Sequence, residues 1–138
     1  GECGLRCTSN VAGEPFAEAV LRTFGEDGFQ AGFEAAGAQA AMDDLVGGIE
    51  KGGEIVVLGV FDRNPTINMS HVGEHELKLI GSLMYKHEDY LEAVDFLAEG
   101  RLNTAPLVTK HFPFEEYRTA YEFIEEQGDK SLKVMIDV

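Results

Sequence analysis

The hydrophobic and polar positions of this chain follow two periods that alternate along the sequence. Between residues 38 and 49, apolar side chains recur three and four positions apart and leave Asp43 and Asp44 on the opposite side, which predicts an amphipathic helix. From Glu54 to Val60 the run is apolar and β-branched without polar alternation, the pattern of a parallel strand covered on both faces. The succession of such helices and strands predicts an α/β fold.

The same two patterns place the remaining elements. Helices are predicted over residues 15–24, 38–49, 87–99 and 114–128, and strands over residues 29–37, 54–60, 77–85 and 131–138, with a short extended segment at 105–114. The helix 87–99 is expected to turn four apolar side chains inward, namely Tyr90, Leu91, Val94 and Leu97. Residues 61–76 are polar and are interpreted as a connection that passes over the sheet.

Three predicted strands end in small or glycine-bearing segments. These are Ala35-Ala36-Gly37, Leu58-Gly59-Val60 and Ile80-Gly81-Ser82. Ligands of open parallel sheets bind outside the carboxyl ends of the strands, and a flat ligand reaches the backbone there only where no side chain intervenes. Each glycine taken singly is also explained by its tendency to end a strand. Three in succession favour a ligand site.

The motifs that would complete such a site are missing from these 138 residues. No two of the 16 glycines are separated by a single residue, which excludes the G-x-G-x-x-G dinucleotide fingerprint, and no G-x-x-x-x-G-K-[ST] loop occurs. The two Cys and four His do not have the pattern of a three-ligand catalytic zinc site, and no G-x-S-x-G motif is found. The residues alone predict half of a nucleotide site, no catalytic residue and no metal ligand.

Composition limits the partners of the chain. It has 25 Asp and Glu against 11 Lys and Arg, a formal charge of −14, so nucleic acid and anionic membrane surfaces would repel it. No run of 18 apolar residues and no N-terminal signal pattern is found, and a cytoplasmic location is expected. With 44% hydrophobic residues, one domain can form its own core.

The two cysteines, Cys3 and Cys7, are expected to be free thiols, because a disulfide framework needs more cysteines and an oxidising compartment. An alternative is a four-ligand zinc site in which Cys3 and Cys7 meet His71 and His75. The loose spacing and the polar surroundings of the histidines make this the weaker hypothesis.

Three stretches of the chain, in a fixed order, carry a resemblance to a known family. They are FEAAGAQAAMDDLVGGIEKGGEIVVLGVF, HELKLIGSLMYKHEDYLEAVDFLAEGRLNTAPLVTKHFPFEEYRTAYEFI and KSLKVMIDV. Together they resemble the C-terminal portion of the zinc-dependent medium-chain alcohol dehydrogenases, the sorbitol and threonine dehydrogenases in particular. The resemblance extends from about residue 16 to residue 138.

The resemblance implies a partial Rossmann-like, doubly wound parallel sheet with flanking helices, without its first strands and glycine fingerprint. Residues 1–100 would be the second half of the dinucleotide-binding domain. Residues 101–138 would be the return segment, which in the family packs on the catalytic domain. The zinc-bearing domain and its metal would lie outside these residues, as the abrupt start of the chain within an α/β pattern also suggests.

The resemblance further implies a cofactor, NAD or NADP, and the residues that contact it. Carried over by position, these are Ala36, Gly37, Leu58, Gly59, Val60, Ile80, Gly81, Ser82 and Lys133. Leu58 and Ile80 would offer backbone carbonyls to the nicotinamide carboxamide, and Ser82 a backbone N–H. Lys133 would approach the pyrophosphate, although an ordinary solvated lysine beside a strand is an equal alternative.

The resemblance also predicts how the sheet edges are used. The strand from Leu77 to Tyr85 matches the element through which such dehydrogenases form homodimers, so a homodimer is expected. The missing glycine-bearing strand would lie against the strand from Phe29 to Ala36, whose bare edge should then be filled either by Leu5 to Ser9 or by another chain.

Two functions are compatible with these residues. The chain is either part of an NAD(P)-dependent, zinc-binding oxidoreductase that moves a hydride between an alcohol and nicotinamide, and inactive by itself, or a small acidic dimeric binding or assembly module derived from a truncated dehydrogenase gene. The alcohol and the choice between NAD and NADP are not readable from this part of the sequence.

Overall fold

The computed structural model describes residues 4–138, which divide into two compact units. Residues 7–85 make one unit, and residues 86–138, with residues 4–6, make the other. This division follows the contacts within the chain. The domain boundary near residue 100 that the resemblance implies stays a prediction.

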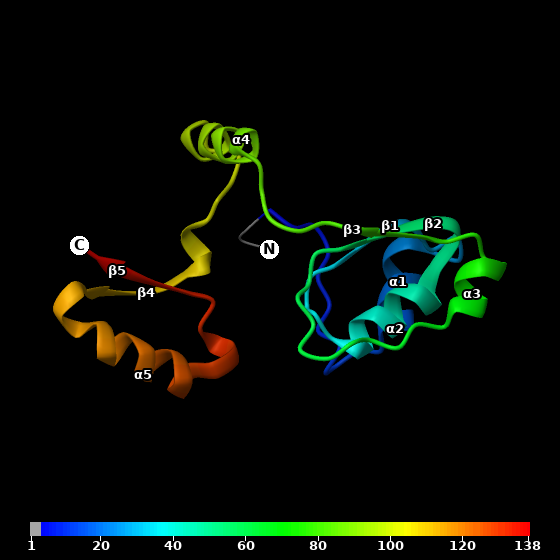
Figure 1. The fold of residues 1–138 in the computed structure, drawn as a ribbon, viewed down its shortest axis with the longest axis horizontal. Coiled ribbons are helices and arrows are strands. Elements are labelled where there is room, and N and C mark those ends of the chain that lie inside the picture. The colour runs from blue at the N-terminus through cyan, green and yellow to red at the C-terminus, as the bar shows by residue number, and fades with distance from the viewer. Residues whose placement is uncertain (1–3) are drawn as a thin grey trace. The chain divides into compact units, whose positions relative to one another are not determined.

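The unit of residues 7–85 is a three-stranded parallel sheet with helices. Its elements are α1 (Phe16–Phe24), β1 (Phe29–Glu34), α2 (Gln39–Gly48), β2 (Ile49–Val57), α3 (Met69–Glu74) and β3 (Lys78–Gly81). The strand order is β1-β2-β3, and both neighbouring pairs are parallel. Figure 1 shows α1 and α2 on the same side of the sheet. The prediction of an α/β fold with a parallel sheet and flanking helices is confirmed.

The core of this unit lies between α2 and the sheet. Met42 and Val46, from the predicted apolar stripe of α2, are buried against Ile55 at the centre of β2. Burial of each such side chain contributes on the order of 1.5–3 kcal/mol relative to exposure. The predicted amphipathic helix is therefore confirmed, and it fixes the strands from which the candidate site extends.

The double glycine at Gly52 and Gly53 lies inside a strand, between the predicted end of a helix at residue 49 and the predicted start of a strand at Glu54. Helix α2 already ends at Gly48, and β2 begins at Ile49. Gly52 has φ +78° and donates its N–H to the carbonyl of His75 at 2.8 Å. The pairing of β1 with β2 is irregular at this point. The glycines bend the strand where a side chain would be strained.

Helix α3 lies within residues 61–76, for which the polar sequence predicts only a connection. The Asn68 side chain accepts a hydrogen bond from the backbone N–H of His71 at 3.1 Å and so caps this helix. Val72 is buried in the core and anchors the helix. One buried residue in six gives too weak a period to be recognised in a polar segment.

The β1 edge of the sheet has no partner strand among residues 4–138, because β1 is hydrogen-bonded to β2 alone. The residues from Leu5 to Ser9 form no strand. The prediction that this segment fills the edge is therefore wrong. Pairing of β1 with another chain stays a prediction.

The unit of residues 86–138 contains a second, two-stranded parallel sheet. Its elements are α4 (His87–Ala98), β4 (Val108–Pro113), α5 (Tyr117–Gln127) and β5 (Lys133–Asp137), with short 3-10 helices at Ala105–Leu107, Phe114–Glu116 and Gly128–Lys130. Helix α5 packs on this sheet (Figure 1) through the buried Ala120 and through Phe123, whose ring lies 5.6 Å from that of Phe112.

Helix α4 is confirmed within a residue of its predicted bounds, but its apolar stripe is not turned inward as predicted. All four side chains of the stripe are exposed, at 58% for Tyr90, 54% for Leu91, 60% for Val94 and 47% for Leu97. Their exposure follows from the absence of any described element packed closely against α4. Neither α4 nor any other described helix has the length and apolar character needed to cross a membrane.

Candidate functional site

The tips of β1 and β2 lie against each other at the carboxyl edge of the sheet. A Cβ added at Gly37, which has φ +64°, would overlap the carbonyl oxygen of Val60. A Cβ added at Gly59 would overlap the backbone nitrogen of Gly37. Both positions therefore require glycine for close approach of two backbones, which is more than the termination of a strand requires. The outcome is a close contact between the two backbones at Gly37 and Gly59.

Glu34, the last residue of β1, connects these two tips, and sequence reasoning missed it. Its Oε1 accepts hydrogen bonds from the backbone N–H groups of Ala36 at 2.9 Å and Gly37 at 2.8 Å. Its backbone carbonyl accepts two more, from Leu58 at 2.8 Å and Gly59 at 2.9 Å. Four backbone N–H groups of the two tips therefore donate hydrogen bonds to Glu34. In a chain with 25 acidic residues, no local signal distinguishes this one.

The tip of β3 belongs to the same edge. Gly81 is paired with Val57, the last residue of β2, and the next residue, Ser82, donates its N–H to the Val57 carbonyl at 3.0 Å. A Cβ at Gly81 would meet no atom within 4 Å, so here packing does not require glycine and the space beside the backbone is open. The N–H that the resemblance assigns to the cofactor is engaged within the chain.

Apolar side chains border this edge. A hollow of about 600 Å³ opens beside it, lined mainly by residues that follow β1 and by the start of α2, with Phe33 at its wall. Phe33 is 67% exposed, and Val60, on the tip of β2, is 78% exposed. The described lining contains Glu34 and Asp44 but no Lys or Arg. The hollow therefore favours a flat, weakly polar group and disfavours a phosphate.

The structure brings eight of the nine predicted cofactor residues to one sheet edge. These are Ala36, Gly37, Leu58, Gly59, Val60, Ile80, Gly81 and Ser82. Lys133 lies in the other unit, at the start of β5, and is exposed. Its approach to a pyrophosphate stays a prediction.

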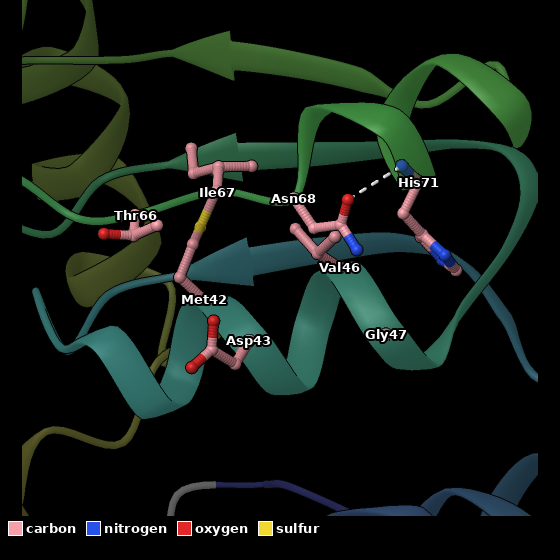
Figure 2. Close-up of a pocket in the computed structure, with 8 residues that line it drawn as sticks. All are labelled: Met42, Asp43, Val46, Gly47, Thr66, Ile67, Asn68 and His71. Atoms are coloured by element: carbon pink, nitrogen blue, oxygen red, sulfur yellow. Dashed lines mark hydrogen bonds between the residues drawn. The ribbon is translucent and has the colours of Figure 1, made fainter.

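A second hollow, of about 150 Å³, separates α2 from residues 66–71 (Figure 2). Gln39 holds these segments together, because its side-chain amide donates to the Thr66 carbonyl at 2.7 Å and accepts from the Thr66 N–H at 2.8 Å. The rings of His71 and His75 have centroids 3.8 Å apart. Partial burial, followed by the neighbouring His71, lowers the pKa of His75.

The described residues do not assemble a metal site. Between residues 4 and 138, no three His, Cys, Asp or Glu side chains come close enough to hold one ion. Cys7 is exposed and free, as predicted for a thiol outside a disulfide framework, while Cys3 lies outside the described residues. Cys7, His71 and His75 therefore do not form the nucleus of the alternative zinc site.

A parallel α/β sheet with glycines at the carboxyl ends of its strands is an arrangement found in nucleotide-binding folds. The family model described as "Zinc-binding dehydrogenase" matches residues 2–99. The chain belongs to the zinc-binding dehydrogenase family, and it corresponds to the C-terminal part of such dehydrogenases.

Individual relatives agree with this assignment. Sorbitol dehydrogenase 1 of Saccharomyces cerevisiae is 31% identical over 89% of this chain and 34% of its own length. L-threonine 3-dehydrogenase of Streptomyces avermitilis is 25% identical over 97% of this chain and 39% of its own length. The crystal structure of L-idonate 5-dehydrogenase from Escherichia coli superposes with a TM-score of 0.73 at 25% identity, over 81% of this chain and 32% of that one. The chain thus spans about a third of the length of the curated relatives it matches.

Proposed function

We propose that the carboxyl edge of the β1-β2-β3 sheet is the nicotinamide-facing part of an NAD(P) site in a zinc-binding oxidoreductase of the alcohol dehydrogenase type. The observation that carries the proposal is that the tips of β1, β2 and β3 lie at one edge, where the space beside the Gly81 backbone is open and an apolar hollow of about 600 Å³ lies alongside. A planar ring can approach backbone that carries no Cβ more closely than backbone that carries a side chain. Membership of the zinc-binding dehydrogenase family supports the choice of ligand.

The residues of the edge would bind and orient the cofactor. Leu58 and Ile80 would offer carbonyls to the carboxamide, and the bare backbone at Gly37 and Gly59 would support the ring. When bound, the nicotinamide supplies hydride chemistry, exchanging a hydride with the carbon of an alcohol. The apolar hollow beside Phe33 would exclude water from one side of the site.

Zinc does not fit the described residues, since they bring no three metal-ligating side chains together. No step of the reaction is therefore assigned to zinc within this chain. We propose that the metal-bearing and pyrophosphate-binding parts belong to the remainder of the dehydrogenase fold. Residues 1–138 alone would then bind the cofactor weakly and would not turn over an alcohol.

Titration with NADH tests the cofactor site directly. In a ¹H–¹⁵N NMR spectrum of the full chain, millimolar NADH should shift the amide signals of Gly37, Gly59 and Gly81 together, while Gly100, which lies in the other unit, serves as the internal reference. Calorimetry of the same titration should show saturable heat. The absence of both heat and shifts at millimolar NADH would refute the proposed site.

The second candidate is a small acidic assembly module, and the unpaired sheet edges favour it. Strands β1 and β3 are the outer strands of the described sheet, so each presents unpaired backbone groups on one side. We propose that the edge from Leu77 to Tyr85 pairs two copies of the chain as a homodimer, whether or not a cofactor binds, and that the protein is cytoplasmic.

A further inference from the structure

The carboxylate of Glu34 is almost completely buried, at 1% exposure, and only one of its oxygens has a partner among the described groups. Oε1 accepts two backbone hydrogen bonds, whereas Oε2 is buried and makes none. An ionisable group in this position is costly, because burial removes it from water without full compensation. A buried polar atom without a partner calls for an explanation, and a role in a functional site is one such explanation.

The position of Oε2 shows which part of the edge depends on it. A Cβ added at Gly59 would overlap both Oε2 and the Gly37 nitrogen, so Oε2 lies against the Gly59 backbone. The carboxylate therefore spans the two tips, with Oε1 bonded to the turn after β1 and Oε2 packed on the tip of β2. Neither tip can move without disturbing this side chain.

We propose that Glu34 is the positioning residue of this edge: its carboxylate, by bonding the Ala36–Gly37 turn and packing on Gly59, sets the spacing of the two backbones that face the ligand. The inference rests on the proposed cofactor site for its function, but its structural part stands on the contacts of Glu34. The role of Glu34 differs from the roles assigned above to backbone groups. Here a buried side chain holds those backbone groups in place.

A positioning role and a merely structural role predict different results for an isosteric variant. Glu34→Gln keeps an acceptor oxygen for the two N–H groups and keeps the shape that packs on Gly59. Glu34→Ala removes acceptor and shape together. If Glu34 positions the edge, Gln should rescue the arrangement that Ala destroys.

Amide hydrogen exchange measures this arrangement without any cofactor. In Glu34→Ala the amides of Ala36 and Gly37 should exchange about tenfold faster or more, the factor expected from loss of one net hydrogen bond. The amides of Leu58 and Gly59 should also accelerate, although their acceptor, the Glu34 carbonyl, is retained. In Glu34→Gln all four should stay within about threefold of the parent chain. Glu26→Ala, which removes an exposed glutamate from the same unit, is the matched control and should change none of them.

The ligand measurement separates this inference from the proposed function. With NADH as the probe, Glu34→Ala should lose the shifts at Gly37 and Gly59, and Glu34→Gln should recover them. If the parent chain shows no shifts, the cofactor site fails while the exchange result still decides the positioning role. Acceleration confined to Ala36 and Gly37 would overturn the spanning role of the carboxylate, and so would a Gln variant as fast as Ala.

One measurement needs no variant and covers the case in which Glu34→Ala does not fold. In the parent chain, couplings across the hydrogen bonds from the ¹⁵N of Ala36 and Gly37 to the ¹³Cδ of Glu34 should be observable. Their absence from a folded, assigned spectrum would overturn the proposal.

Discussion

At the scale of single residues, the candidate site depends on two glycines whose lack of a Cβ lets the strand tips approach each other. Gly37 and Gly59 bring two backbones together, and no other residue leaves that space. Their importance is readable from the sequence, because glycines recur at successive strand ends. The role of Glu34 cannot be predicted from the sequence, because its burial arises only when β1 and β2 are paired and its carboxylate lies against Gly59. Local sequence identifies backbone requirements better than it identifies buried polar partners.

The substitution Gly59→Ala tests the close approach. The new methyl group would overlap the Gly37 nitrogen and the Glu34 carboxylate, so the two tips must separate. We expect the free energy of unfolding, measured by urea titration, to fall by about 1–3 kcal/mol, the usual cost of overpacking. NADH-induced shifts at Gly37 should be lost in the same variant.

Gly73→Ala is the matched control for that substitution. Gly73 lies in α3, and a Cβ there would meet no atom within 4 Å. The free energy of unfolding should rise by about 0.5–1 kcal/mol, because alanine is the better helix former. Equal effects of the two alanines would show that Gly59 is not held against Gly37.

At the scale of elements, the sequence predicted the strands and long helices well and the short or irregular pieces poorly. The apolar stripe of α2 depends on local periodicity and is confirmed. The β-branched run does form β2, but the strand ends at Val57, and Leu58 and Val60 beyond it are exposed instead of covered on both faces. Helix α3 is only six residues long, and the double glycine of β2 has two compatible interpretations. The Gly52 N–H donates to the His75 carbonyl, and Val72 anchors α3 in the core. Neither contact is visible in a local sequence pattern.

His71, in α3, and His75, the residue that follows α3, lead to a prediction about the pH dependence of stability. Partial burial lowers the pKa of His75 below its ordinary 6.5, with further lowering by His71 and Lys51 and an opposing effect of Glu74. Below pH 6.5 the unfolded chain therefore binds a proton at this position more readily than the folded chain. The contribution of His75 to the free energy of unfolding is fully present above the pKa that His75 has in the unfolded chain. It is lost as the pH falls from that value through the lower pKa of the folded chain.

We expect the urea midpoint to decrease between pH 7.5 and pH 5, and His75→Gln to reduce the decrease. The variant His87→Gln, at the exposed start of α4, is the control and should retain the pH dependence of the parent chain. Identical pH profiles for the parent chain and His75→Gln would show that His75 does not contribute.

At the scale of the whole molecule, the open question is how the sheet edges are covered. Within the described residues, β1 and β3 each pair with another strand on one side only. The chain spans about a third of the length of its curated relatives. Two copies related by a two-fold axis would pair the same strand edge to edge, and such an interface is self-complementary. The proposed homodimer uses β3 and the residues after it, which leaves the β1 edge for a different partner.

Sedimentation measurements on matched variants of the two edges decide between them. The parent chain should sediment at twice its 15.1 kDa. Leu83→Lys, at a residue that is 77% exposed just beyond β3, should shift it to the mass of one chain, because two like charges would meet across the axis. Phe33→Lys places the same charge beside the β1 edge, at a residue 67% exposed, and should leave the dimer intact. A dimer that survives Leu83→Lys but dissociates in Phe33→Lys would assign the interface to β1, and a parent chain that sediments as a monomer would remove the homodimer altogether.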